Sequence, residues 1–198
     1  MSYAVIIDWF GPYSSVEAAK QEERNAPFGE SLYLAIGSVK RRPAPQIQYI
    51  GITLDVEYRF DTKHTIRREI NQEGLNLWVG VVSSQAVSGR KGAGLTRRHN
   101  TLVQLAEGVL IYFLQPPLNK DKRKRIQKDH SVMVYNRWWK ADGETRRRQR
   151  PHPTWPDVIE YDTYTDIGVV AWLGGRKRYY NSDDLREIGE IAKRDLSK

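Results

Sequence analysis

The chain has 198 residues, enough for one full hydrophobic core, and 39% of them are hydrophobic, including six tryptophans and eleven tyrosines. This composition excludes an intrinsically disordered chain. There is no cysteine, which excludes disulfides and thiolate-bound metals, and there is no apolar run of transmembrane length and no signal-peptide pattern. We therefore expect a soluble, cytoplasmic protein without a membrane partner.

In chain order, strand patterns and helix patterns alternate through the first half of the sequence. Clusters of apolar and β-branched residues predict strands, and a capping serine or a helical period predicts helices. The predicted strands span residues 3–7, 31–36, 47–52 and 75–84. The predicted helical segments span residues 16–25 and 55–72, the second one in two pieces. The strands at 31–36 and 47–52 are close enough in sequence to form a hairpin with an enlarged loop.

Residues 98–119 contain a helix that is apolar on almost every side, and Pro116 and Pro117 end it. Such a helix is normally buried, yet this one carries an acid, Glu107, whose neighbours at helical spacing are apolar. Burying an ionised carboxylate is costly unless the group is paired or holds a metal. Taken alone, the pattern favours a structural ion pair between Glu107 and an arginine.

The formal net charge of +8 is unevenly distributed, because residues 120–150 contain twelve basic and four acidic side chains. Concentrated positive charge attracts polyanions, and nucleic acid is the first candidate. Tyr135, Trp138 and Trp139 lie among these charges. These aromatic residues favour a binding surface over a solvated charge run that has no partner.

After the basic stretch, a proline-marked linker leads into a β-rich tail that ends in an amphipathic helix. The three predicted strands of the tail span residues 158–162, 167–173 and 176–180. The closing helix begins at the capping residue Ser182, and its apolar residues lie roughly on one face: Leu185, Ile188, Ile191 and Leu196. We divide the chain into residues 1–119, a core with an N-terminal strand–helix extension, and residues 120–198, a basic arm with a small β-rich region.

Two short motifs stand on the strands of the predicted hairpin, Ser31-Leu32-Tyr33 and Tyr49-Ile50-Gly51. Arg59 follows Tyr49 by ten residues, and Asn119 follows Glu107 by twelve. In this order and spacing, these positions resemble the GIY-YIG endonuclease family over residues 31 to 120. The first motif has Ser-Leu in place of Gly-Ile, and the loop between the tyrosines is longer than usual in the family.

The resemblance implies an α+β fold in which helices flank a small central antiparallel sheet, to which a basic, β-rich C-terminal extension is attached. It implies a divalent-metal-dependent endonuclease that hydrolyses phosphodiester bonds in double-stranded DNA. The size of the chain fits a site-specific, restriction-type enzyme better than a homing or repair nuclease, and a defence role is also open. Glu107 would hold one Mg²⁺ or Mn²⁺ ion per active site, which suits oxygen and water ligands.

The resemblance also assigns roles to side chains. Tyr33 is the candidate general base, Tyr49 would orient the water or the phosphate, and Arg59 would grip the scissile phosphate. Asn119 would fix the metal-site geometry or a nearby loop. Many members have a histidine four residues after the arginine; here that position is Lys63, and His64, which follows it, is a further candidate catalytic residue.

The candidate DNA contacts are basic side chains in four parts of the chain. They are Lys40, Arg41, Arg42, Lys63, Lys122, Arg123, Lys124, Arg125, Arg146, Arg147 and Arg148. A single site is equipped to cut one strand, so a double-strand break calls for two sites, most simply in a homodimer on a palindromic target.

Two other functions fit parts of the sequence. Asp129-His130 and Asn136 are similar to residues of the ββα-metal nucleases, but a second histidine is missing. A chain with the same fold and basic surface but a degenerate site would be a DNA- or RNA-binding module. Glu107 argues against such a module, because an acid beside a phosphate backbone repels it.

Overall fold

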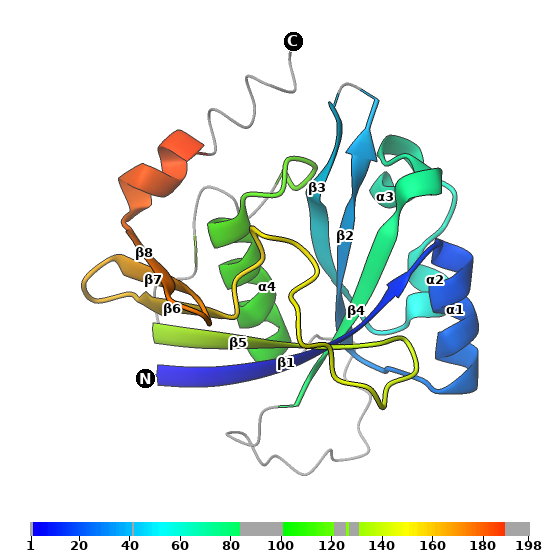
Figure 1. Ribbon diagram of the computed structural model, residues 1–198, viewed down its shortest axis with the longest axis horizontal. Coiled ribbons are helices and arrows are strands. Elements are labelled where there is room, and N and C mark those ends of the chain that lie inside the picture. Colours follow the sequence, from blue (N-terminus) through cyan, green and yellow to red (C-terminus); the bar gives the residue numbers. More distant parts are fainter. Residues whose placement is uncertain (1, 41, 84–100, 121–125, 127–130, 189–198) are drawn as a thin grey trace.

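The computed structural model describes residues 2–40, 42–83, 101–120, 126 and 131–188. Eight strands of this part of the chain form one sheet, in the order β3-β2-β4-β1-β5-β6-β7-β8 (Figure 1). The strands are β1 (Ser2–Tyr13), β2 (Ser31–Val39), β3 (Arg42–Thr53), β4 (Asn76–Val82), β5 (Ser131–Trp139), β6 (Val158–Asp162), β7 (Ile167–Trp172) and β8 (Arg176–Tyr180). The helices are α1 (Val16–Asn25), α2 (Val56–Arg59), α3 (Thr65–Glu69), the 3-10 helix η1 (Gln72–Gly74), α4 (Thr101–Leu114) and residues 182–188. None of these helices is long and apolar enough to cross a membrane.

The strand β1 lies at the centre of the sheet. It pairs antiparallel with β4 on one side and parallel with β5 on the other, and the other neighbouring strands pair antiparallel. Asp8 on β1 accepts hydrogen bonds from Arg137 Nε at 2.7 Å and from Trp139 Nε1 at 2.6 Å, and both donors lie on β5. Although burial opposes its charge, these contacts hold the pKa of Asp8 below its ordinary value. The ionised carboxylate therefore links two strands that are far apart in the sequence.

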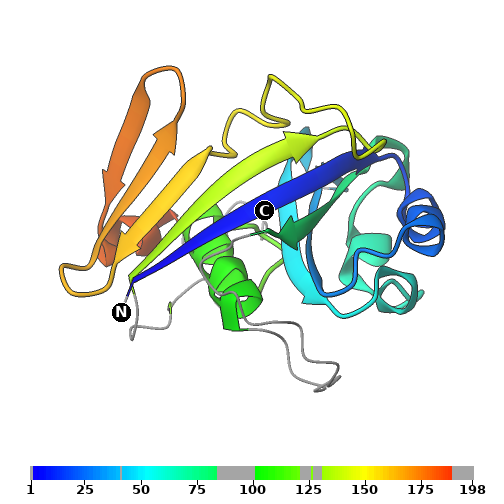
Figure 2. The same ribbon diagram turned by 90° about the horizontal axis from the view of Figure 1, so that it is seen from below.

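The sheet curls into a half-barrel, and α4 packs across its inner face (Figure 2). This apolar helix contacts β1, β2, β3, β5 and β6. Trp155 packs on the same face, where its ring meets those of Trp9 and Trp78 edge to face, at centroid distances of 4.9 and 5.9 Å. A second apolar cluster, which includes Tyr33 and Phe60, joins α1, α2 and α3 to β2 and β4. The described helices on the outer face thus cover the half of the sheet that contains β2 and β4.

The predicted fold class was wrong. The structure is one curled, mixed sheet of eight strands, and not a small central antiparallel sheet flanked by helices. The cause is β5, because residues 131–139 were assigned to a basic arm although buried and partly exposed side chains alternate along them. Through β5, the strands β6, β7 and β8 of the tail continue the sheet that β1 and β4 belong to. The division of the chain between residues 119 and 120 stays a prediction.

Most of the other predicted elements are confirmed, with shifted ends. The helix over residues 16–25 begins after Ser15, whose Oγ accepts a hydrogen bond from Ala18 N at 3.0 Å. The segment 55–72 forms α2, α3 and η1. Leu185 in the closing helix is buried, whereas Ile191 and Leu196 lie outside the described residues. Trp138, expected on a binding surface, packs in the core and is only 5% exposed.

Candidate functional site

The two motif tyrosines lie side by side on neighbouring strands. Tyr33 is on β2 and Tyr49 is on β3, and their rings stack with centroids 6.0 Å apart and planes inclined by 15°. Gly51 is the register partner of Tyr33, and a Cβ atom at this position would collide with the Tyr33 hydroxyl. The glycine of the second motif therefore leaves the space that the Tyr33 ring occupies.

The hydroxyl of Tyr33 is the point at which two other candidate residues meet. Arg59 donates a hydrogen bond from Nε to this hydroxyl at 2.9 Å, and His64 Nε2 lies 3.1 Å from the same oxygen. Arg59 ends α2, a helix that Asp55 caps by accepting hydrogen bonds from Glu57 N and Tyr58 N. His64 caps α3. Two short helices that follow β3 thus carry both side chains back onto β2.

The proton on His64 can be assigned from its two hydrogen bonds. Nδ1 accepts a hydrogen bond from Ile66 N at 3.2 Å. Burial and the charge of Arg59 lower the pKa of His64 to about 4, so the ring is neutral at pH 7. A neutral imidazole that accepts at Nδ1 carries its hydrogen on Nε2. The Tyr33 oxygen therefore accepts two hydrogen bonds, from Arg59 and His64, and keeps its own hydrogen to donate.

The protonation of Tyr33 bears on its predicted role as the general base. Burial raises the pKa of Tyr33, and Tyr49 raises it further, whereas Arg59 acts in the opposite direction. A phenol that stays protonated at pH 7 is a poor proton acceptor. The surroundings of Tyr33 therefore favour a role as a hydrogen-bond donor and weigh against a role as a base.

Glu107 on α4 lies close to this cluster and is only 8% exposed. Glu107 and Tyr49 line one cavity of about 600 Å³, together with Asn119. Although burial opposes the charge of Arg59, its interactions with Tyr33, Tyr49 and Glu107 raise its pKa above the ordinary value. The structure thus brings together all six predicted catalytic residues.

Asn119 acts on the backbone of β3. Its Oδ1 accepts a hydrogen bond from Ile50 N at 2.9 Å, and its Nδ2 donates to Ile50 O at 2.7 Å. The preceding residue, Leu118, donates from its backbone nitrogen to Gln48 O at 3.0 Å. Because both ends of the Asn119 amide bind the backbone beside Tyr49, this residue fits the second of its two predicted roles, that of fixing a nearby loop.

The donors around the cavity fit the predicted divalent ion. Glu69 also lines the cavity of Glu107, so the carboxylates there are oxygen donors, as Mg²⁺ and Mn²⁺ prefer. Within the described residues, no group of three or more His, Cys, Asp or Glu side chains is gathered to form a metal cage. Glu107 and Glu69 are therefore the carboxylates in this cavity that would hold the ion.

Some lining residues were not predicted from the sequence. Arg68 and Glu69 on α3 and Lys120 after α4 contribute to the same cavity. Arg68 follows His64 by four residues. This helical spacing places both residues on one side of a helix, and it could have indicated Arg68 from the sequence. Arg68 and Lys120 add positive charge close to the carboxylates.

The predicted DNA contacts are only partly described. Lys40 and Lys63 are exposed, and Lys63 adjoins His64. Arg146, Arg147 and Arg148 line a different cavity. Arg42 is the first residue of β3. The remaining residues lie outside the described part of the chain: Arg41, Lys122, Arg123, Lys124 and Arg125.

The residues behind the ββα-metal alternative do not form a site among the described residues. Asn136 is buried, and its amide accepts a hydrogen bond from Trp9 Nε1 at 2.8 Å and donates one to Pro156 O at 3.0 Å. Asp129 and His130 lie outside the described residues. Asn136 is thus a structural residue of the core.

The arrangement of Tyr33, Tyr49, Arg59, His64 and Glu107 is one that can position a phosphate and hold a cation beside it. Arginine matches phosphate oxygens, the tyrosine hydroxyls donate hydrogen bonds, and a buried carboxylate suits a divalent ion. Comparison of the chain with protein-family models, with curated proteins and with solved structures gives no match.

Proposed function

We propose that this protein is a divalent-metal-dependent endonuclease of the GIY-YIG type that hydrolyses phosphodiester bonds in double-stranded DNA. The observation that supports this proposal best is the convergence of Arg59 and His64 on the Tyr33 hydroxyl, beside the cavity that Glu107 lines. Hydrolysis requires an oriented water, neutralised charge on the phosphoryl oxygens and a stabilised leaving oxygen. The gathered side chains have the chemistry for each of these tasks.

Each residue has a defined part in the proposed reaction. Arg59 donates a hydrogen bond from Nε to Tyr33, so its terminal guanidinium nitrogens bind the phosphoryl oxygens and offset their charge. Tyr33 is fully buried, so its hydroxyl orients the Arg59 guanidinium, and His64 holds the phenol in place. Glu107 holds the cation, which supplies charge neutralisation when it is bound.

We also propose that cleavage is site-specific and of the restriction type. The chain has no nucleotide-binding loop motif, so cleavage should proceed without ATP. The lack of cysteine fits a reducing compartment, and we propose the cytoplasm.

Plasmid cleavage with purified protein and Mg²⁺ or Mn²⁺ tests the proposal. We expect discrete fragments on a gel for a site-specific enzyme, and a smear for a nonspecific one. Glu107→Gln should abolish cleavage while DNA binding in EDTA is kept or improved, because the cation anchor and a negative charge are both lost.

Glu23→Gln is the matched control, because Glu23 on α1 is equally buried, at 7% exposed against 8% for Glu107, and does not line the candidate cavity. This variant should cut as the wild type does. Absence of cleavage by the wild type across several DNAs and both metals, with binding retained, would instead favour the nucleic-acid-binding module.

A further inference from the structure

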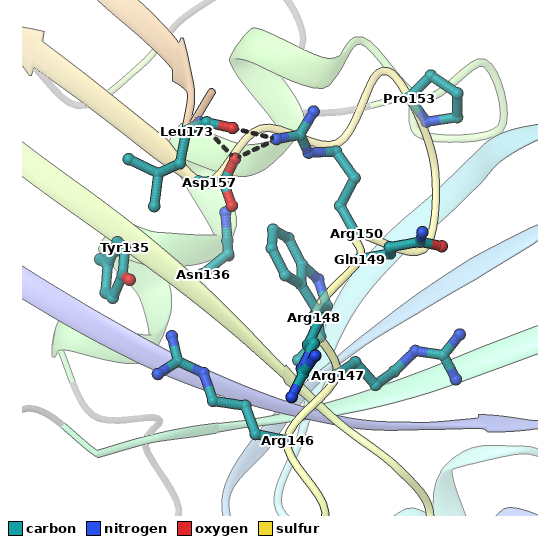
Figure 3. A pocket seen from close by; sticks show the side chains of 11 residues that line it. Tyr135, Asn136, Arg146, Arg147, Arg148, Gln149, Arg150, Pro153, Asp157 and Leu173 are labelled. Atoms are coloured by element: carbon teal, nitrogen blue, oxygen red, sulfur yellow. Dashed lines mark hydrogen bonds and ion pairs between the residues drawn. The ribbon is translucent and has the colours of Figure 1, made fainter. Parts of the chain in front are cut away.

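A second cavity of about 860 Å³ lies beside β5 and shares no lining residue with the cavity of Glu107. Its walls come from β5, from residues 146–157 and from Leu173 after β7 (Figure 3). Four arginines line it, Arg146, Arg147, Arg148 and Arg150, against one acid, Asp157. The lining therefore carries a strong excess of positive charge.

Arg150 and Asp157 compensate each other. Arg150 Nη2 lies 2.8 Å from Asp157 Oδ2 and donates a further hydrogen bond to Leu173 O at 2.9 Å. Asp157 also accepts a hydrogen bond from Leu173 N at 2.8 Å. Figure 3 shows these contacts on one wall of the cavity. Arg150 is thus a structural residue that ties the segment to the end of β7.

The other three arginines have no such partner. Among the described residues, no carboxylate forms an ion pair with Arg146, Arg147 or Arg148. Their positive charges line one cavity, and an anion bound there would offset them.

Arg147 is held in position before any ligand arrives. Its guanidinium lies over the ring of Trp78, 5.5 Å from the centroid, and its backbone nitrogen donates to Trp138 O at 2.8 Å. Arg147 Nε and Trp138 Nε1 are both buried and have no hydrogen-bond partner among the described residues. Buried donors without acceptors are costly, so a ligand that brings several oxygen acceptors would gain from both.

We propose that this cavity is a second phosphate-binding site, which takes a phosphate group of a nucleotide through Arg146, Arg147 and Arg148. The planar guanidinium fork matches phosphate oxygens, and a tetrahedral phosphate can accept from three arginines at once. Tyr135, which is partly exposed in the same walls, offers aromatic surface to the attached base, and the volume falls in the range of small-ligand sites. The phosphate comes from a DNA strand or from a free nucleotide; the strand as its source rests on the proposed function.

The test measures binding in EDTA, so that its result does not depend on cleavage. Fluorescence anisotropy with a labelled DNA duplex, repeated over a range of salt concentrations, is applied to the double variant Arg146→Gln/Arg148→Gln. Both side chains are exposed and should not be needed for folding. The matched control is Arg186→Gln. Arg186 is exposed, its guanidinium lies 3.2 Å from the carboxylate of Asp183, and it does not line the cavity.

We expect the log–log salt slope of duplex binding to fall by about one unit for each lost phosphate contact in the double variant, and to stay unchanged in the control. A parallel titration with dAMP, followed by calorimetry, separates the two sources. Saturable dAMP binding that the double variant loses identifies a free-nucleotide site, whereas a changed duplex slope without dAMP binding identifies the strand. A double variant that matches Arg186→Gln in both titrations would overturn the proposal.

Discussion

At the scale of single residues, the hydroxyl of Tyr33 carries more of the proposed chemistry than any other group, because Arg59 and His64 both contact it. Tyr33→Phe removes this shared acceptor, so that Arg59 and His64 are less well positioned. We expect cleavage to fall on the order of 10²-fold, because a small displacement of a group that positions the substrate has an effect of this size. Single-turnover cleavage of a plasmid measures the loss.

Tyr13→Phe is the control for this substitution. Tyr13 is also buried, but its hydroxyl has no hydrogen-bond partner among the described residues. Its removal should leave cleavage unchanged and should maintain or raise stability. Equal cleavage rates for Tyr33→Phe and the wild type would show that the Tyr33 hydroxyl only packs.

The buried His64 predicts a pH dependence of stability. Its pKa falls from 6.5 to about 4 on folding, first because of burial and then because of Arg59. Between these two values the unfolded chain binds a proton that the folded protein does not, so the free energy of unfolding decreases as the pH falls below 6.5. The slope from this one group is at most about 1.4 kcal/mol per pH unit.

His64→Asn isolates this contribution, because asparagine can cap α3 but does not titrate. Urea unfolding at pH 5, 6 and 7 should show that the wild type loses stability toward acid more steeply than the variant does. Parallel pH profiles for the two proteins would mean that His64 is not held neutral in the folded state.

At the scale of elements, the candidate site depends on how the loop after α4 meets β3. The strand β3 ends the sheet, and Leu118 and Asn119 bind the outward backbone groups of Gln48 and Ile50. An unpaired strand edge is prone to pairing with other chains, and this loop covers part of it. The same contacts fix Tyr49, which lies between Gln48 and Ile50.

Asn119→Ala should therefore weaken both the edge and the site. Two buried hydrogen bonds are lost and two backbone groups are left without partners, at a cost of about 1–3 kcal/mol for each unsatisfied group. Urea unfolding should show this loss, and cleavage should fall because Tyr49 is less well held. Asn25→Ala, which removes one exposed hydrogen bond with Gln21, should change neither quantity.

The spatial proximity of the candidate residues was easier to predict from the sequence than the fold. Tyr33, Tyr49 and Arg59 sit on elements that follow one another directly, so local spacing is enough to bring them together. The strand β5 was not predicted, because charged residues surround its alternating apolar residues. Its parallel partner β1 also lies more than a hundred residues earlier in the chain. No local signal reports such a distant pairing, and the sheet that results could not be foreseen.

At the scale of the whole molecule, no helix among the described residues covers the outer face of the sheet at β5, β6, β7 and β8. Met133, Glu160, Val169 and Tyr179 are successive cross-strand neighbours on β5, β6, β7 and β8. Met133 and Tyr179 are exposed. Cutting both DNA strands requires two sites of opposite polarity, which a homodimer would supply. We expect this face to form the dimer contact, because exposed apolar side chains lie on it.

Light scattering with and without a DNA site should report a dimer in at least the DNA-bound state, and Tyr179→Glu should weaken it. A cleavage time course should show linear plasmid forming with little free nicked circle, and more nicked circle for the variant. A protein that stays monomeric in both conditions and accumulates only nicked circles would exclude the dimer.

The central position of β1 also sets the spacing between the two cavities. Because β1 is hydrogen-bonded to β4 on one edge and to β5 on the other, the two halves of the sheet form one continuous ladder. The cavity of Glu107 and the arginine-lined cavity therefore keep a fixed separation, unlike sites on two domains joined by a linker. This separation sets the minimum length of a DNA duplex that can contact both cavities. A shorter duplex would lose all contacts with one of the two cavities.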